Sequence, residues 1–131
     1  PYETIGTNKM VKNMLTDRLL SECKLKQKKY IVSRNKEYYL TMQEDGNLVL
    51  YNSREFVASN AVWASGTNGQ GEAPFTFRVQ DDGNAVVYDK EDNPTWATGT
   101  HGQGQGPYCV VVSNEGKLCV YDTNDEQLWS S

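Results

Sequence analysis

A repeat with a period of 33 residues is the feature that most limits how this chain can fold. Trp63, Trp96 and Trp129 stand 33 residues apart. The segments QEDGNLVLY (43–51) and QDDGNAVVY (80–88) precede the first two tryptophans and agree at six of nine positions. Short repeated units bury their apolar faces by packing against one another, so residues 1–131 are predicted to form a single domain of three units.

The spacing from tyrosine to tryptophan reveals an insertion and a third unit. Tyr88 and Tyr121 each precede a tryptophan by eight residues, whereas Tyr51 precedes Trp63 by twelve. A four-residue insertion is therefore expected in the loop after Tyr51. Counting back from Tyr121 gives an eroded third copy, SNEGKLCVY, at residues 113–121.

Each unit is predicted to be all-β. Short runs rich in β-branched and aromatic residues lie at 39–42, 48–51, 75–79, 85–88, 109–112 and 118–121. Gly46, Gly83 and Gly116 stand between paired runs, where glycine supplies the positive φ of a tight hairpin. The glycine-rich stretches 66–71 and 99–106 are expected to be loops.

The segment from Asn8 to Glu22 allows two interpretations. It forms either strands or a helix whose one face would carry Met10, Met14, Leu15 and Leu19. We favour strands, because three sheets close around a shared core only when the first is complete. The N-terminal segment would then supply the missing strands.

Charge argues against nucleic acid and membrane partners. The net charge is -4, and the one basic cluster, residues 24–29, is expected to be a strand with a solvated face rather than a phosphate-binding patch. The sequence has no apolar run long enough to span a bilayer and no basic amphipathic helix.

Trp63, Trp96 and Trp129 occupy equivalent positions in the three units. They are either an aromatic platform for a ligand or a stack of indoles near a pseudo-threefold axis. Small neighbours follow each of them (Ala64, Ala97 and Ser130), which favours the core.

Spaced polar residues in the two intact copies point to a sugar site. Alternate residues of a strand share a face, so Asn47, Val49 and Tyr51 lie together, with Gln43 and Asp45 across the turn. The second copy repeats the set as Gln80, Asp82, Asn84, Val86 and Tyr88. Carboxylate, amide and phenol groups match the paired donors and acceptors of sugar hydroxyls, and valine can touch the C–H face of the ring. Such shallow sites are expected to bind weakly, about millimolar, and to gain from repetition.

The pattern Q-x-D-x-N-x-V-x-Y resembles that of the monocot, or bulb-type, mannose-binding lectins, which also have animal members in fish skin and mucus. The resemblance runs from about Asn13 to Trp129, and we expect this chain to be one of the animal members. It implies a β-prism II fold of three four-stranded antiparallel sheets with pseudo-threefold symmetry around a central Trp cluster. It also implies mannose and mannose-containing glycans as ligands, no metal or other cofactor, and dimerisation, which many members achieve by exchanging a C-terminal strand.

The resemblance assigns roles to both intact copies. Gln43 and Gln80 would bind the 3-hydroxyl of mannose, and Tyr51 and Tyr88 the 4-hydroxyl. The axial 2-hydroxyl would be held by Asp45, Asn47, Asp82 and Asn84, while Val49 and Val86 would pack on ring carbons.

The third copy departs from this pattern. Its positions hold Ser113, Glu115, Lys117, Cys119 and Tyr121, so only the tyrosine remains. Lys117 replaces an amide and could pair with Glu115, so we expect this site to be lost.

Three cysteines leave their pairing open. Cys109 and Cys119 flank the turn at 113–116, so the alternatives are a disulfide between them, with Cys23 left over, or three free thiols. The family's usual cysteines bracket a hairpin of an earlier repeat, so its disulfide does not transfer.

Three functional classes compete. The leading one is a secreted or mucosal lectin that cross-links high-mannose glycans as a homodimer in agglutination and innate defence. Three free thiols would instead favour a cytoplasmic localisation. The alternative is a protein-binding or structural module that uses the third face, with Lys117, Glu115 and Asp122. An enzyme is not expected, because the single histidine lies in a glycine-rich loop and the carboxylates lie mainly at turns.

Overall fold

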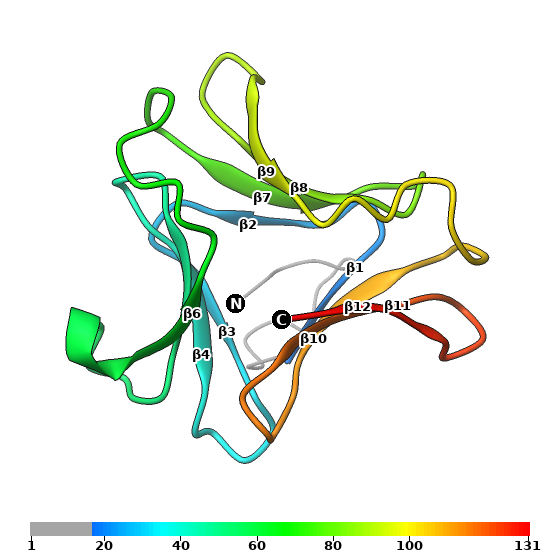
Figure 1. Ribbon diagram of the computed structural model, residues 1–131, viewed down its shortest axis with the longest axis horizontal. Helices are drawn as coiled ribbons and strands as arrows, with labels where there is room; N and C mark the ends of the chain where they lie inside the picture. Colours follow the sequence, from blue (N-terminus) through cyan, green and yellow to red (C-terminus); the bar gives the residue numbers. More distant parts are fainter. Residues whose placement is uncertain (1–16) are drawn as a thin grey trace, which may run out of the picture.

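Three four-stranded antiparallel sheets form the three sides of a triangle in the computed structural model, which describes residues 17–131 (Figure 1). One sheet has the order β3 (Tyr30–Val32), β4 (Tyr39–Met42), β5 (Leu48–Tyr51), β6 (Ala61–Ala64). The next has β2 (Lys24–Lys26), β7 (Thr76–Val79), β8 (Ala85–Tyr88), β9 (Pro94–Ala97). The last has β1 (Arg18–Leu20), β10 (Cys109–Val112), β11 (Leu118–Tyr121), β12 (Gln127–Ser130). The predicted all-β architecture is confirmed.

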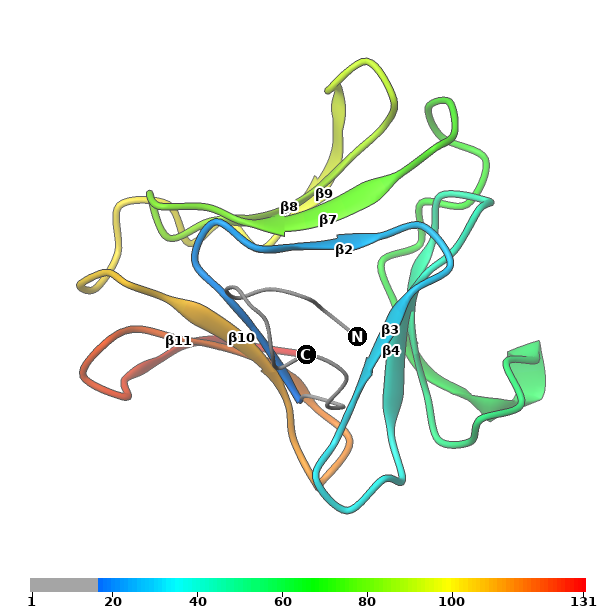
Figure 2. The same cartoon turned by 180° about the vertical axis from the view of Figure 1, so that it is seen from behind.

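The first strands of the described chain complete all three sheets. Figure 2 shows residues 17–32 running along each side of the triangle in turn, so that β1, β2 and β3 join three different sheets. Strands were expected in the segment Asn8–Glu22, and β1 confirms this for its end; the part up to residue 16 lies outside the described residues. The first half of the basic cluster, β2, is a strand with a solvated face as predicted, since Lys24 and Lys26 are exposed and Leu25 between them is buried; residues 27–29 lie in the turn that follows.

Alternation of side chains explains the core. In β5, Leu48 and Leu50 are fully buried and point toward the centre, while Val49 and Tyr51 lie on the opposite, outer face. The other sheets repeat this pattern, so one apolar core fills the space between them. Among residues 17–131, no helix is long and apolar enough to cross a membrane.

The three tryptophans pack against one another at the edge of this core. Their ring centroids are 5.4 Å (Trp63–Trp96), 5.6 Å (Trp96–Trp129) and 5.9 Å (Trp63–Trp129) apart, all edge to face. Edge-to-face contact is the favoured geometry of aromatic pairs. The predicted central Trp cluster is therefore confirmed, with indoles that are half-buried rather than fully enclosed.

Each hairpin glycine fits under an aromatic ring of the neighbouring sheet. A Cβ on Gly46 would lie 2.9 Å from Phe75, one on Gly83 would lie 3.0 Å from Tyr108, and one on Gly116 would lie 2.7 Å from Tyr38. All three glycines have a positive φ, between 82° and 96°. These contacts brace the turn of every sheet against the next sheet around the triangle, and we call them the turn locks.

Cys109 and Cys119 do not form a disulfide with each other, so the disulfide alternative for this pair is wrong. The register of the hairpin gives the reason, because Cys109 pairs with Tyr121 and Cys119 pairs with Val111. The two cysteines are thus offset by two residues along the strands instead of facing each other.

Candidate functional site

The two intact repeat motifs lie on the outer faces of two different sheets. In the first sheet Val49 pairs with Thr41, and Tyr51 pairs with Tyr39. In all three sheets the pairing of the last two strands shifts immediately before the motif tyrosine, as at Leu50/Tyr51. Such bulges bend a strand and redirect a side chain. Residues 43–51 form what we call site 1, and residues 80–88 form site 2.

The polar side chains of site 1 are linked by hydrogen bonds. The Gln43 amide donates to the Asp45 carboxylate at 3.0 and 3.2 Å, and the Tyr51 hydroxyl donates to the Gln43 carbonyl oxygen. Asp45 also accepts from the Asn47 backbone N–H at 2.9 Å. Burial, and next the charge of Asp45, raise the pKa of Tyr51, so its hydroxyl stays protonated and can donate. The structure therefore brings three of the five predicted side chains into one network, and Asn47 joins it through its backbone N–H.

Site 2 repeats the arrangement with small differences. The Gln80 amide donates to the Tyr88 hydroxyl, and Asp82 accepts from the Asn84 backbone N–H at 2.9 Å. Val86 occupies the place of Val49, and each valine is 3% exposed. Because so little of either valine is exposed, a sugar ring would contact mainly the polar side chains of these sites.

Two loops that the sequence predicted only as connections, residues 65–67 and 98–100, each hold one of the two asparagines in place. The side-chain amide oxygen of Asn47 accepts from the Ser65 hydroxyl at 3.1 Å and from the Gly66 and Thr67 backbone N–H groups at 2.9 and 3.2 Å. Asn84 receives the same bonds from Thr98, Gly99 and Thr100, at 3.3, 2.9 and 3.2 Å. The asparagine oxygen is thus committed to the scaffold, and its NH₂ group remains for a ligand. The repeated W-A-S/T-G-T after each strand pair was the available signal.

The four-residue insertion adds an aromatic wall to site 1. The loop between β5 and β6 spans 52–60, against 89–93 and 122–126 in the other units, which confirms the predicted insertion. It places Phe56 against Tyr51, with ring centroids 4.9 Å apart and planes inclined by 19°. A cavity of about 350 Å³ lies beside Phe56, and Gln43 and Asp45 also line it.

Site 2 has a cation in place of this wall. Arg78 pairs with Val86 across the strands, where site 1 has Thr41. Its guanidinium lies 4.5 Å from the centre of the Tyr88 ring and 3.3 Å from the Asp92 carboxylate. The two sites therefore share their polar residues and differ in what covers their tyrosine.

The third copy lacks both the network and the loop anchor. The Ser113 hydroxyl accepts from the Glu115 and Lys117 backbone N–H groups at 3.2 and 3.1 Å, which keeps the turn closed. Among the described residues no ion pair joins Lys117 to Glu115, so the pairing considered from sequence does not form. Cys119 is buried behind Ser130, and Tyr121 bonds to Gln127 at 3.3 Å.

Asp122 is also withdrawn from the third face. It is 4% exposed and accepts backbone hydrogen bonds from Asn124, Glu126 and Gln105 at 2.9 to 3.1 Å. It therefore shapes its own loop and is not available for the protein contact considered from sequence.

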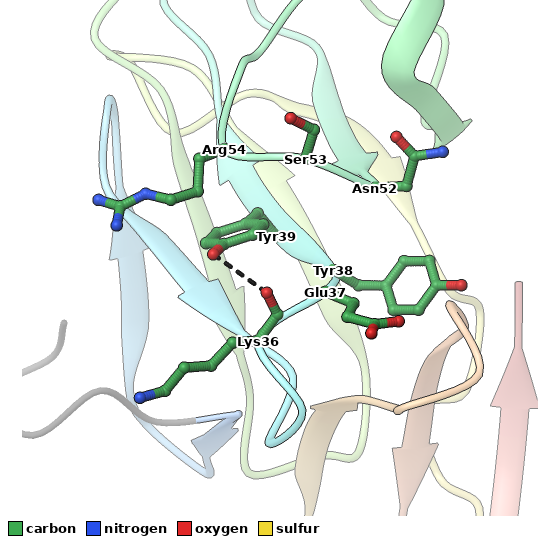
Figure 3. Close-up of a pocket in the computed structure, with 7 residues that line it drawn as sticks. All are labelled: Lys36, Glu37, Tyr38, Tyr39, Asn52, Ser53 and Arg54. Atoms are coloured by element: carbon green, nitrogen blue, oxygen red, sulfur yellow. Dashed lines mark hydrogen bonds between the residues drawn. The ribbon is translucent and has the colours of Figure 1, made fainter.

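A second concavity of about 540 Å³ lies at the far end of the first sheet (Figure 3). Its lining, Lys36, Glu37, Tyr38, Tyr39, Asn52, Ser53 and Arg54, includes no residue of site 1. Figure 3 shows Lys36 and Arg54 extending to one side of it and Tyr38 to the other, with the Tyr39 hydroxyl bonded to the Lys36 carbonyl oxygen at 3.2 Å. In residues 17–131, no cluster of three His, Cys, Asp or Glu side chains has the geometry of a metal site.

Comparisons with known proteins place this fold and these motifs among lectins. No model of a protein family matches the chain. A curated mannose-specific lectin from Dendrobium findlayanum is 46% identical over 55 residues, covering 42% of this chain and 29% of that lectin. The chain thus spans less than a third of that relative's length.

Two solved structures cover most of the chain. A monomeric monocot mannose-binding lectin from Gastrodia elata has a TM-score of 0.76 and 32% identity, over 88% of this chain and 96% of that one. The snowdrop (Galanthus nivalis) mannose-specific agglutinin, in complex with methyl α-D-mannoside, has a TM-score of 0.70 and 31% identity, over 82% and 90%. The expected β-prism II fold is confirmed, and these relatives are lectins, not enzymes.

Proposed function

The chain belongs to the monocot mannose-binding lectins, and from this premise we propose that it binds mannose at site 1 and site 2 without a metal ion. One observation carries the proposal. The two motifs place the same Gln, Asp, Asn, Val and Tyr on the outer faces of two sheets, with the glutamine hydrogen-bonded to the tyrosine in both.

The network suits a sugar with adjacent hydroxyls, one of them axial. Before binding, the glutamine, carboxylate and phenol of site 1 satisfy one another, and in site 2 the glutamine and phenol do so, which means that these groups are already oriented when the ligand arrives. Sugar hydroxyls donate to the Asp45 and Asp82 carboxylates and accept from the free NH₂ of Asn47 and Asn84. Exchange of these bonds for bonds to sugar explains why each site should be weak, about millimolar.

The test is an NMR titration with methyl α-mannoside in the presence of EDTA, with methyl α-galactoside as control. We expect the Asn47 and Asn84 amides to shift with mannoside only, and the Lys117 amide to stay unchanged. Gln80→Ala should remove the response of site 2 and leave that of site 1, whereas Ser113→Ala should leave both. If neither asparagine shifts at tens of millimolar sugar, mannose binding is refuted.

Cross-linking of high-mannose glycans follows as a finer proposal. The outer faces of the two sheets point in different directions (Figure 1), so two sites on one chain can engage two separate glycans. We also propose a homodimer with four sites. Sedimentation equilibrium decides between dimer and monomer, and agglutination of mannan-coated beads tests cross-linking.

We further propose that this lectin acts in innate defence as a secreted protein of fish skin or mucus. The support is the resemblance of residues 43–51 and 80–88 to the motif that the animal members share. Detection by antibody in washed mucus, and not in cell lysate, would support it; detection in lysate alone would refute it.

A further inference from the structure

Site 1 has an aromatic surface that the other two units lack. Loops 89–93 and 122–126 are tight because a buried aspartate at their start accepts backbone N–H groups from within the loop. The first unit has Asn52, an exposed residue, at that position, and its longer loop leaves the sheet with a short 3-10 turn, Ala58–Asn60 (Figures 1 and 2). Phe56 lies in this loop.

Phe56 is held in place but not covered. It is stacked on Tyr51, and its centroid lies 6.1 Å from those of both Tyr30 and Tyr39. Despite these three contacts it remains 38% exposed. An apolar ring fixed by its neighbours and left open on one side is a preformed platform, which loses little entropy when a ligand covers it.

The platform and the polar site share one cavity. The cavity of about 350 Å³ is lined by Gln43 and Asp45 of site 1, by Phe56, and by Lys28, Thr41 and Glu44. Lys28 and Glu44 form an ion pair of 3.6 Å on its rim, where both remain largely exposed. The concave surface of site 1 therefore continues past the residues that would hold one hexose, and its lining there includes the Phe56 ring and the charged groups of Lys28 and Glu44.

We propose that Phe56 forms a second subsite, specific to site 1, which binds the next sugar ring of a mannose-terminated oligosaccharide. The aliphatic C–H face of a pyranose carries partial positive charge and packs on the negative face of an aromatic ring. Site 2 has no counterpart, because its loop is short and Arg78 lies over Tyr88. This inference rests on the proposed mannose binding and makes the two sites unequal, because site 1 would bind two sugar units and site 2 would bind one.

The test compares one and two sugars at each site in the same sample. Methyl α-mannoside and the α1,2-, α1,3- and α1,6-linked mannobioses are titrated separately, and affinities are taken from the amide shifts of Asn47 and Asn84. We expect at least one mannobiose to bind site 1 about three- to tenfold more tightly than the monosaccharide, and site 2 to show no such gain. Phe56→Ala should abolish the gain at site 1 and leave monosaccharide affinity there within twofold.

Two control variants separate the subsite from an indirect effect. Val57→Ala changes the next residue of the same loop, which is 46% exposed and does not line the cavity, and should keep the gain. Phe56→Tyr keeps an aromatic ring and should keep it too. A monosaccharide response at site 1 without any disaccharide gain overturns the subsite and leaves mannose binding intact. Equal losses of both sugars in Phe56→Ala also overturn it, because Phe56 would then act only by positioning Tyr51. No response to any sugar at either site overturns mannose binding itself.

Discussion

The turn lock at Gly83 predicts a measurable packing cost when a single methyl group is added. Gly83→Ala places a Cβ 3.0 Å from the Thr100 carbonyl oxygen and 3.0 Å from the Tyr108 ring, in a residue with a φ of 96°. Gly99 is the matched control, since its φ is also positive, at 73°, but a Cβ there meets nothing within 4 Å. The two substitutions share the cost of the backbone conformation and differ in the cost of crowding.

The magnitudes follow from these two terms. A left-handed conformation costs a non-glycine residue about 1–2 kcal/mol, which is the whole expected loss for Gly99→Ala. Crowding in a packed position adds about 1–3 kcal/mol, so Gly83→Ala should lose about 2–5 kcal/mol. The carbonyl of Thr100 is backbone and cannot swing aside, which favours the upper half of that range.

Urea unfolding followed by tryptophan fluorescence measures both, because the three indoles of the central cluster separate on unfolding. The free energy of unfolding should fall by at least about 1 kcal/mol more for Gly83→Ala than for Gly99→Ala, with the urea dependence unchanged. Gly83→Ala should also weaken mannoside binding at site 2 and spare site 1. Equal destabilisation by the two substitutions would refute the idea that the lock is a packing contact.

Three further predictions concern site 2, pH and the thiols. Arg78→Thr removes the guanidinium from the Tyr88 ring, so mannoside should bind site 2 about two- to fivefold more tightly, and an unchanged affinity would show that the cation does not compete with sugar. Hydrogen bonds from backbone N–H groups, the strongest effect being that of Asn93, lower the pKa of Asp89. The ionised carboxylate therefore contributes fully to stability above the unfolded-state pKa of about 3.9, and this contribution is lost as the pH falls through the folded-state pKa. The unfolding free energy should therefore drop as the pH falls below about 4, and Asp89→Asn should make that drop smaller; an identical drop would refute the assignment. Without reductant, Ellman's reagent should find three thiols in the urea-unfolded chain, and a count of one would restore the disulfide. In the folded protein Cys109 should react slowly, because burial raises the pKa of its thiol.

The repeat made the architecture and the polar site residues predictable, because both depend on spacing. A period of 33 residues fixes equivalent tryptophans, and alternation in a strand fixes which of Asn47, Val49 and Tyr51 share a face. The length of the insertion after Tyr51 followed from the same counting.

Features that depend on register or on contacts between distant segments were not predictable in this way. Arg78 reaches Tyr88 because of the pairing of β7 with β8, and Cys109 misses Cys119 because of the pairing of β10 with β11. The loop after Trp63 folds back over the turn to hold Asn47; the repeated W-A-S/T-G-T marks this loop as equivalent in two units but does not show which residue it contacts. Phe56 stood in an insertion with no second copy to compare it with.

The way the first strands complete the sheets has a consequence for the order of folding. Ile31 pairs with Leu40, Leu25 with Phe77, and Leu19 with Val110, so the sequence distance to be closed grows from one sheet to the next. Closing a longer loop costs more chain entropy, and contacts between distant residues slow folding. We expect β3 to dock first, β2 next and β1 last, so that the sheet without an intact sugar motif is the final one to be sealed. Pulsed hydrogen exchange would show this as late protection of the Leu19 and Val110 amides.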